Sequence, residues 1–325
     1  MTGVFLAPTM NIWTSELLIS DLFHQTSQIW RFKALEAQLR DSCQIDIEDL
    51  IDVDPRLASL PEVYQEFRHA IRGPNLDFDR IERIILNDAD LTVRLLKIIN
   101  SSFYSFSSKI NTIAQAIAVI GTEQLSYLVL STVVMDKFRG IPESVINMNS
   151  FWRHSIACGL VSKKLADYKR ELNSEKHFMF GMLHDIGRLV MCMSIPNRNW
   201  EVFIRSNSDN KAVHLMEAAE LGFDHAQLGA ALLRKWGLPE VYLEVVEFHH
   251  NPSQALLFPV EVAHCHLADI IANALKLGCS GESEIIPKLN EDAWDMAGPP
   301  QNINMGAIKD EVADIFEETV SVFLS

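Results

Sequence analysis

The chain has 325 residues, 48% of them hydrophobic, which is enough to bury the core of one large or two ordinary domains. Its 43 acidic against 28 basic side chains give a net charge of −15, and so acidic a surface argues against nucleic-acid binding because it repels phosphate backbones. The five cysteines are far apart and form no C-x-x-C pair, which indicates reduced thiols and a cytoplasmic protein. The first basic side chain is Arg31, and no apolar run reaches about 18 residues, so we expect neither a secretory signal nor a membrane span.

The N-terminal part, residues 1–57, is expected to be a helical extension. Apolar residues recur at helical spacing through 15–39, and the acidic segment 46–54, which ends before Pro55, is typical of a connector. We assign no chemistry to this part.

A smaller helical subdomain is predicted over residues 58–142. Apolar residues recur at helical spacing in several segments between residues 60 and 100. Thr112 and Gln115 form a capping-box pattern at the start of a further helix, which we expect to end at Gly121. Thr122 is expected to begin another helix that runs to about residue 138.

Residues 143–278 are predicted to form a helical core, followed by a C-terminal loop and helix over 279–325. Ser150 is the expected cap of the helix 151–168, and the apolar segment 178–191 is long enough for one buried helix. Further helices are predicted over 196–221, 223–236, 239–250, 259–277 and 305–323. Strand alternation and hairpin dipeptides are missing from the sequence, so the predicted fold class is all-α.

Several of these helices place a histidine or an aspartate on an apolar face. His154 aligns with Ala157, Cys158 and Val161, His225 with Leu228 and Leu232, His249 with Tyr242 and Val246, and Asp269 with Val262 and Cys265. His184 and Asp185 lie in the middle of the apolar segment 178–191, where an ionised carboxylate requires a partner.

Hard oxygen and borderline nitrogen donors in one apolar environment suit a divalent cation, whose charge offsets the cost of burying the carboxylates. Each histidine alone is more often a hydrogen-bonded core residue than a metal ligand, but seven such histidines and aspartates together favour the metal. The pattern therefore leaves two interpretations, a metal centre and a metal-free helical scaffold.

The order of His154, His184-Asp185 and Asp269 resembles the H…HD…D pattern of the HD superfamily of metal-dependent phosphohydrolases. More closely, the chain resembles the HDOD (HD-related output domain) family of bacterial signalling proteins over residues 58–278. The matching segments are DLTVRLLKIINS (90–101), AIAVIG (116–121), FWRHS (151–155), GMLHDIGRL (181–189), HAQLGA (225–230), KWGLP (235–239) and HHNP (249–252).

The resemblance implies an HD-type helical bundle preceded by the smaller subdomain, with two divalent ions of iron, manganese, zinc or nickel. The metal ligands that it implies are His154, His184, Asp185, His225, His249, His250 and Asp269. If the protein is an enzyme, the resemblance implies that Asp185 bridges the ions and that Arg188 grips a substrate phosphate.

Two departures from the family branch that hydrolyses cyclic di-GMP bear on activity. The Gly-Tyr-Pro element of those enzymes is replaced here by Asn251-Pro252-Ser253, and Arg188 stands where they commonly carry lysine. Arginine does not substitute freely for a compact ammonium group.

Two functions therefore remain open, together with the scaffold. The first is a bacterial signal-transduction module that contacts a kinase, cyclase or receptor and holds a metal or a small phosphorylated or nucleotide ligand. The second is a metal-dependent phosphohydrolase or cyclic-dinucleotide phosphodiesterase.

The remaining histidines receive lesser roles. We expect His264 and His266 to support the centre from outside the ligand set. We expect His24, His69, His177 and His214 to lie on the surface.

Overall fold

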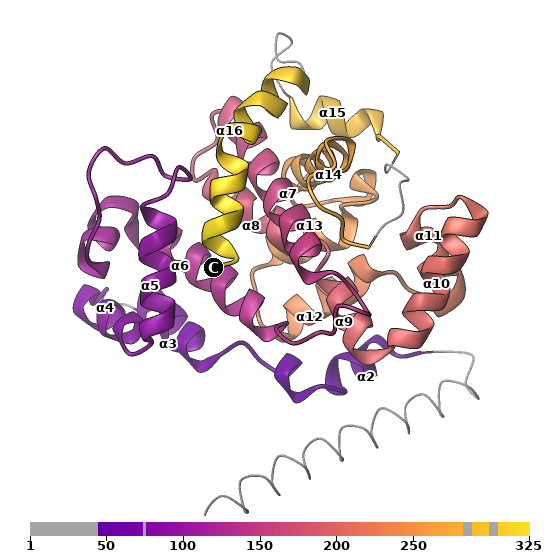
Figure 1. The fold of residues 1–325 in the computed structure, drawn as a ribbon, viewed down its shortest axis with the longest axis horizontal. Helices are drawn as coiled ribbons and strands as arrows, with labels where there is room; N and C mark the ends of the chain where they lie inside the picture. The colour runs from indigo at the N-terminus through magenta and orange to yellow at the C-terminus, as the bar shows by residue number, and fades with distance from the viewer. Residues whose placement is uncertain (1–44, 74–75, 282–287, 299–304) are drawn as a thin grey trace, which may run out of the picture. The chain divides into compact units, whose positions relative to one another are not determined.

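The computed structural model describes residues 45–73, 76–281, 288–298 and 305–325. These residues form helices and no strand, which confirms the all-α prediction (Figure 1). The helices of the N-terminal half are α2 (Ile47–Asp52), η1 (Pro55–Leu57), α3 (Glu62–Arg72), α4 (Phe78–Leu86), α5 (Ala89–Ile99), α6 (Ile113–Lys137) and α7 (Met148–Tyr168). Those that follow are α8 (Glu175–Leu183), α9 (Ile186–Ser194), α10 (Pro196–Asp209), α11 (Val213–Leu221), α12 (His225–Lys235), α13 (Glu240–Phe248), η2 (Pro252–Gln254), α14 (Pro259–Ala274), α15 (Glu291–Ala297) and α16 (Met305–Phe323).

Residues Asp46–Ser325 form one compact unit. The prediction that the acidic segment 46–54 is a connector was therefore wrong. The segment forms α2, whose Leu50 and Ile51 are fully buried against α9 and α12. The helix predicted over residues 15–39 lies outside the described residues.

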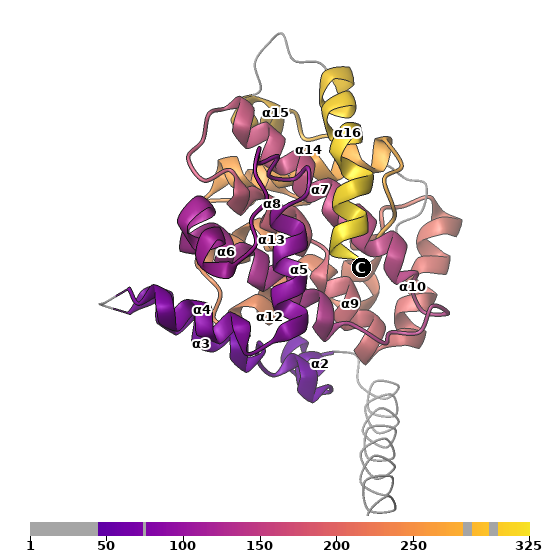
Figure 2. The same cartoon turned by 60° about the vertical axis from the view of Figure 1, so that its left-hand side comes forward.

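The helices α3 to α6 form the smaller subdomain, in indigo and purple on one side of the bundle (Figures 1 and 2). The predicted break at Gly121 is present as a kink inside α6, where the backbone adopts a φ of +78°. Among the described helices, α6 alone is long and apolar enough to cross a membrane, and 56% of its apolar window is buried inside the protein. That burial is typical of a core helix.

The core is built around α7 and α8, which pack on each other and on α14, while α9 packs on α12 and α12 on α13. The C-terminal helix α16 lies along α7 and α5, so it joins the core to the smaller subdomain (Figure 2). The helix α15 packs on α14.

Three predicted helix boundaries were wrong. The segment 178–191 is not one helix, because α8 ends at Leu183 and α9 begins at Ile186. The helix α7 begins at Met148, with the Asn147 side chain accepting a hydrogen bond from the Ser150 amide, so Asn147 rather than Ser150 is the cap. The segment 196–221 is two helices, α10 and α11, separated at Asn210 in a left-handed conformation.

Candidate metal centre

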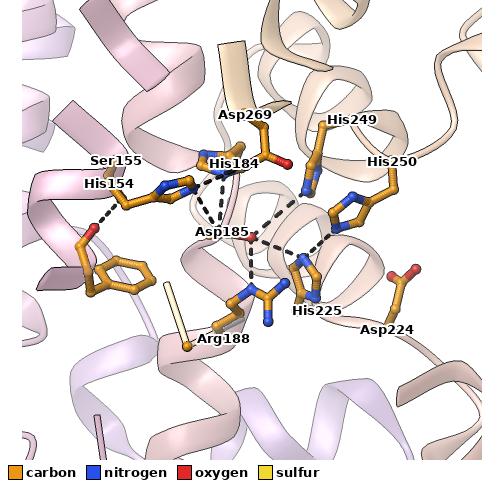
Figure 3. A network of polar contacts seen from close by, with 12 residues as sticks. His154, Ser155, His184, Asp185, Arg188, Asp224, His225, His249, His250 and Asp269 are labelled. Atoms are coloured by element: carbon orange, nitrogen blue, oxygen red, sulfur yellow. Dashed lines mark hydrogen bonds and ion pairs between the residues drawn. The ribbon is translucent and has the colours of Figure 1, made fainter. Parts of the chain in front are cut away.

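The seven predicted metal ligands converge at one place in the core, around Asp185 (Figure 3). Asp185 and Asp269 are 2% and 3% exposed and four of the five histidines are fully buried, whereas His250 is partly exposed. The ligands come from α7 (His154), the break between α8 and α9 (His184, Asp185), the start of α12 (His225), the end of α13 (His249, His250) and α14 (Asp269).

Two glycines explain how the His184-Asp185 break reaches its neighbours. A Cβ atom at Gly181 would lie 2.2 Å from the backbone nitrogen of Gly159, so α8 packs directly on the backbone of α7. A Cβ atom at Gly187 would lie 2.0 Å from the backbone oxygen of His225, so α9 packs equally closely on α12. Because the two helices approach different partners, the chain breaks between them and presents both polar side chains there.

One set of donor atoms, which we call the first donor group, consists of His154, Cys158, His184 and Asp269. His154 Nε2 lies 3.1 Å from Asp269 Oδ1 and 3.4 Å from Cys158 Sγ. The Oδ2 atom of Asp185 faces this group, at 3.2 Å from His184 Nε2 and 3.8 Å from His154 Nε2.

The second donor group consists of Asp185, His225, His249 and His250. Asp185 Oδ1 lies 3.0 Å from His225 Nε2 and 3.8 Å from His249 Nε2, while His225 Nε2 lies 2.9 Å from His250 Nε2. Donors at about 2.0–2.1 Å from a tetrahedral ion are about 3.3 Å apart, so the spacings of both groups suit a small divalent cation.

The hydrogen bonds of three imidazoles direct their Nε2 lone pairs toward Asp185. His184 Nδ1 donates to the Gly181 carbonyl at 2.7 Å, and His249 Nδ1 donates to the Val246 carbonyl at 2.7 Å. His225 Nδ1 donates to Glu217 Oε2 at 2.6 Å. Fixing the tautomer through the other ring nitrogen is what proteins do with metal-binding histidines.

Two of those inward nitrogens, Nε2 of His184 and Nε2 of His249, are buried without a hydrogen-bond partner. Buried polar atoms of this kind are rare and call for an unseen partner. A divalent cation accepts lone pairs, so the residues present fit a metal.

The electrostatics of Asp185 keep its carboxylate ionised. Burial by itself would raise the pKa of Asp185, but the Arg188 guanidinium and the His184 imidazole outweigh it and hold the pKa well below its usual range. Arg188 Nε donates to Asp185 Oδ1 at 3.0 Å, and Arg188 is itself 1% exposed. The arginine thus lies on the side of the second donor group.

Without a cation, the second donor group splits into charged and neutral imidazoles. Burial and Arg188 oppose protonation of His225, yet Glu217 and Asp185 raise its pKa to about 10. Burial and neighbouring imidazoles lower the pKa of both His249 and His250 well below the ordinary value. His249 and His250 therefore stay neutral, as metal-binding imidazoles must be.

Glu217 is a functional candidate that the sequence analysis missed. It is fully buried on α11 and accepts from both the backbone nitrogen and Nδ1 of His225, at 2.9 and 2.6 Å. Its position on the apolar stripe of α11, with Val213, Met216 and Leu221, is the same signal that singled out His154.

Two histidines predicted to lie on the surface do not. His214 is half-buried, and its ring stacks on that of His250 with centroids 4.0 Å apart. His177 is fully buried in a separate cluster with Glu171 and His264. His69 is exposed as predicted, and His24 lies outside the described residues.

His266 takes the supporting position expected of it. Its Nδ1 donates to the His249 carbonyl at 2.7 Å, and its Nε2 accepts from the Asn290 amide at 3.1 Å. His264 does not touch the centre, since it contacts His177 at 3.3 Å and the Ala297 carbonyl at 3.2 Å.

The all-helical fold and the His/Asp centre define an HD-like protein. The family model of the HDOD domain matches residues 57–252, and the chain therefore belongs to the HDOD domain family.

Its relatives are distant. An uncharacterised protein of Treponema pallidum (strain Nichols) is 26% identical over 211 residues, which cover 64% of this chain. The match spans 40% of that relative's length.

Solved structures share the fold. An HDOD domain protein of unknown function from Geobacter sulfurreducens is 20% identical and matches with a TM-score of 0.66, covering 82% of this chain and 91% of that one. A candidate metal-dependent phosphohydrolase from Shewanella amazonensis SB2B, also 20% identical, gives 0.61 and covers 92% of this chain and 99% of that one.

Proposed function

We propose that the protein is a cytoplasmic bacterial signalling module of the HDOD type, which binds divalent metal in its His/Asp centre and acts through contacts with other signalling proteins. The observation that carries the proposal is the enclosure of the centre. Of the seven ligand-capable residues, His250 alone is partly exposed. A centre so enclosed suits an ion that holds helices together, whereas a catalytic ion needs a coordination position open to substrate.

The types of donor atom at the centre support the proposal that it binds metal. Each donor group offers imidazole nitrogens, and carboxylate oxygens face both, a mixture that suits iron, manganese, zinc or nickel. We propose two ions, one in each group, with Asp185 between them. A bound ion would fix α7, α8, α12 and α14 relative to one another, and the presence or absence of metal could then be transmitted to a partner.

A phosphohydrolase is the second candidate, and the pairing of two donor groups across one carboxylate favours it. When bound, a pair of ions supplies an activated water and neutralises charge on a phosphoryl group. In that reading Asp185 would serve as a metal ligand and Arg188 would bind a substrate phosphate. The solved structure from Shewanella amazonensis SB2B, described as a candidate metal-dependent phosphohydrolase, shares the fold of this chain.

The test is elemental analysis of protein purified without chelator or affinity metal. Wild type, Asp185→Ala and the control Asp167→Ala, which removes a half-exposed carboxylate of α7, are compared. We expect equal metal content in wild type and in the control, and a lower content in Asp185→Ala. Equal metal content in all three proteins would refute the assignment of the centre.

A phosphodiester and cyclic-dinucleotide panel then separates the two candidates. Metal-loaded protein that hydrolyses none of them supports the signalling module. Turnover that disappears in Asp185→Ala supports the enzyme. Affinity capture of a kinase, cyclase or receptor that requires bound metal would establish the signalling role directly.

A further inference from the structure

The buried charges around Asp185 do not balance. Three carboxylates, those of Asp185, Asp269 and Glu217, face one guanidinium, that of Arg188, and all four residues are at most 3% exposed. The imidazoles that bind a metal must be neutral. The centre therefore carries two net negative charges in surroundings where unbalanced charge is costly.

Two divalent cations among neutral imidazoles leave the centre doubly positive. One cation in the first donor group offsets the two negative charges, and His225, which keeps its proton while the second donor group holds no cation, adds one positive charge on the side of the second group. We propose that the centre holds one divalent cation at rest, in the first donor group, and takes a second into the second donor group only together with a small anion such as phosphate. This inference rests on the proposed metal binding and goes beyond it to the order and linkage of loading.

The position of Arg188 decides which group is filled first. Arg188 Nε donates to Asp185 Oδ1, the oxygen that belongs to the second donor group, at 3.0 Å. The Oδ2 atom faces His184 and His154 of the first donor group instead. A cation in the second group therefore meets the guanidinium at closer range than one in the first.

The negative charge of Glu217 partly offsets the positive charge of Arg188, and it is already included in the two net negative charges of the centre. It lies 3.9 Å from Arg188 Nη1 and accepts from His225 at 2.6 Å. Asp224, the N-cap of α12, is only half-buried and is bonded to the Gln227 amide. Its charge is screened by solvent and contributes little.

The repulsion between the second cation and the unbalanced positive charge follows from Coulomb's law. For a divalent ion, a unit of like charge about 5 Å away at an effective dielectric constant of about 20 weakens binding on the order of 10⁵-fold. A hydroxide supplies one negative charge and leaves the doubly loaded centre positive, whereas a doubly charged phosphate cancels the excess. Because His250 is partly exposed, an anion can approach the second donor group from its side.

The experiment is a calorimetric titration of metal-free protein with Mn²⁺, with and without inorganic phosphate, followed by electron paramagnetic resonance of the bound ion. We expect one ion per chain without phosphate and a magnetically isolated signal. With phosphate we expect a second ion and the spectrum of a coupled pair. Phosphate should strengthen binding of the second ion by several orders of magnitude, on the order of 10⁵-fold at that dielectric constant.

Two variants test the role of Arg188. Arg188→Met removes the charge while keeping an extended side chain, so the second ion should bind without phosphate. Arg188→Lys keeps the charge and should keep the phosphate requirement. If Arg188→Met does not fold, Glu217→Gln replaces it; by making the centre less negative, that variant should increase the phosphate requirement.

The outcomes separate this inference from the proposed function. Wild type that binds no ion at all contradicts the metal centre itself. Wild type that binds two ions equally well without phosphate overturns the present inference and leaves the metal centre intact. Phosphate dependence that persists in Arg188→Met overturns the assignment to Arg188.

Discussion

Gly187→Ala should damage one half of the centre and spare the other. The added Cβ would lie 2.0 Å from the His225 carbonyl oxygen and 2.7 Å from the Gly229 nitrogen, whereas ordinary contacts are 3.4 Å or longer. Both obstacles are backbone atoms that cannot rotate away, so α9 and α12 must separate by about 1 Å. Overpacking of a core contact costs about 1–3 kcal/mol, and we expect the upper end of that range here.

The functional consequence follows from the helices involved. Moving α12 away carries His225 from its 3.0 Å contact with Asp185, so the second donor group opens. The first donor group draws on α7, α8 and α14, which do not pack on that contact. At saturating Mn²⁺ and phosphate, Gly187→Ala should therefore bind one ion where wild type binds two.

The assay combines denaturant unfolding of metal-free protein with a count of bound Mn²⁺. Gly181→Ala is the matched variant, because its Cβ would lie 2.2 Å from the Gly159 nitrogen and separate α8 from α7. That variant should lose the ion of the first donor group. Unchanged stability and two retained ions in Gly187→Ala would show that the close approach of α9 and α12 does not position His225.

Three further predictions concern single side chains. Glu217→Gln should weaken metal binding by the second donor group about 10–100-fold, measured by competition with a chelator. Glu220→Gln, a control on α11 whose carboxylate pairs with Arg205 instead of His225, should not. Burial lowers the pKa of His264 to about 4, so the unfolded chain binds more protons between pH 4 and 6.5 and stability falls as pH drops through that window. The loss reaches about 3 kcal/mol, and His264→Gln should remove this part of the pH dependence of unfolding; an unaltered pH profile would refute the account. Trp236→Phe removes the indole donor to the buried Leu57 carbonyl at 2.9 Å and should cost about 1 kcal/mol in thermal or denaturant unfolding, and an unchanged unfolding free energy would contradict it.

Helical periodicity in the sequence predicted most of the fold. Apolar stripes predicted the helices of both subdomains, and the kink of α6 followed from Gly121 alone. The same stripes singled out His154 and Asp269, because a polar residue in an apolar stripe must point inward. Their mutual distances depend on how helices far apart in sequence pack, which periodicity does not contain.

The break at His184-Asp185 was not predicted, because the apolar residues on either side continue a helical pattern. It follows from two tertiary contacts, Gly181 on α7 and Gly187 on α12, that pull the two halves in different directions. The burial of His177 was not predicted, for a related reason. It follows the polar residues Glu175 and Lys176 in sequence, yet it is fully buried, its ring 3.3 Å from His264 of α14.

The enclosure of the centre also bears on the choice between signalling and catalysis. His250 is the one ligand with partial exposure, and the His214 ring stacks on it with centroids 4.0 Å apart, so we expect a molecule from solvent to approach the second donor group at this pair. His214 and the His225 partner Glu217 both lie on α11. A cyclic dinucleotide is larger than an ion with a phosphate, so we expect its entry to require displacement of His214 and hence of α11. Because that motion would also displace Glu217 from His225, binding a large substrate would disturb the second donor group on which its hydrolysis depends.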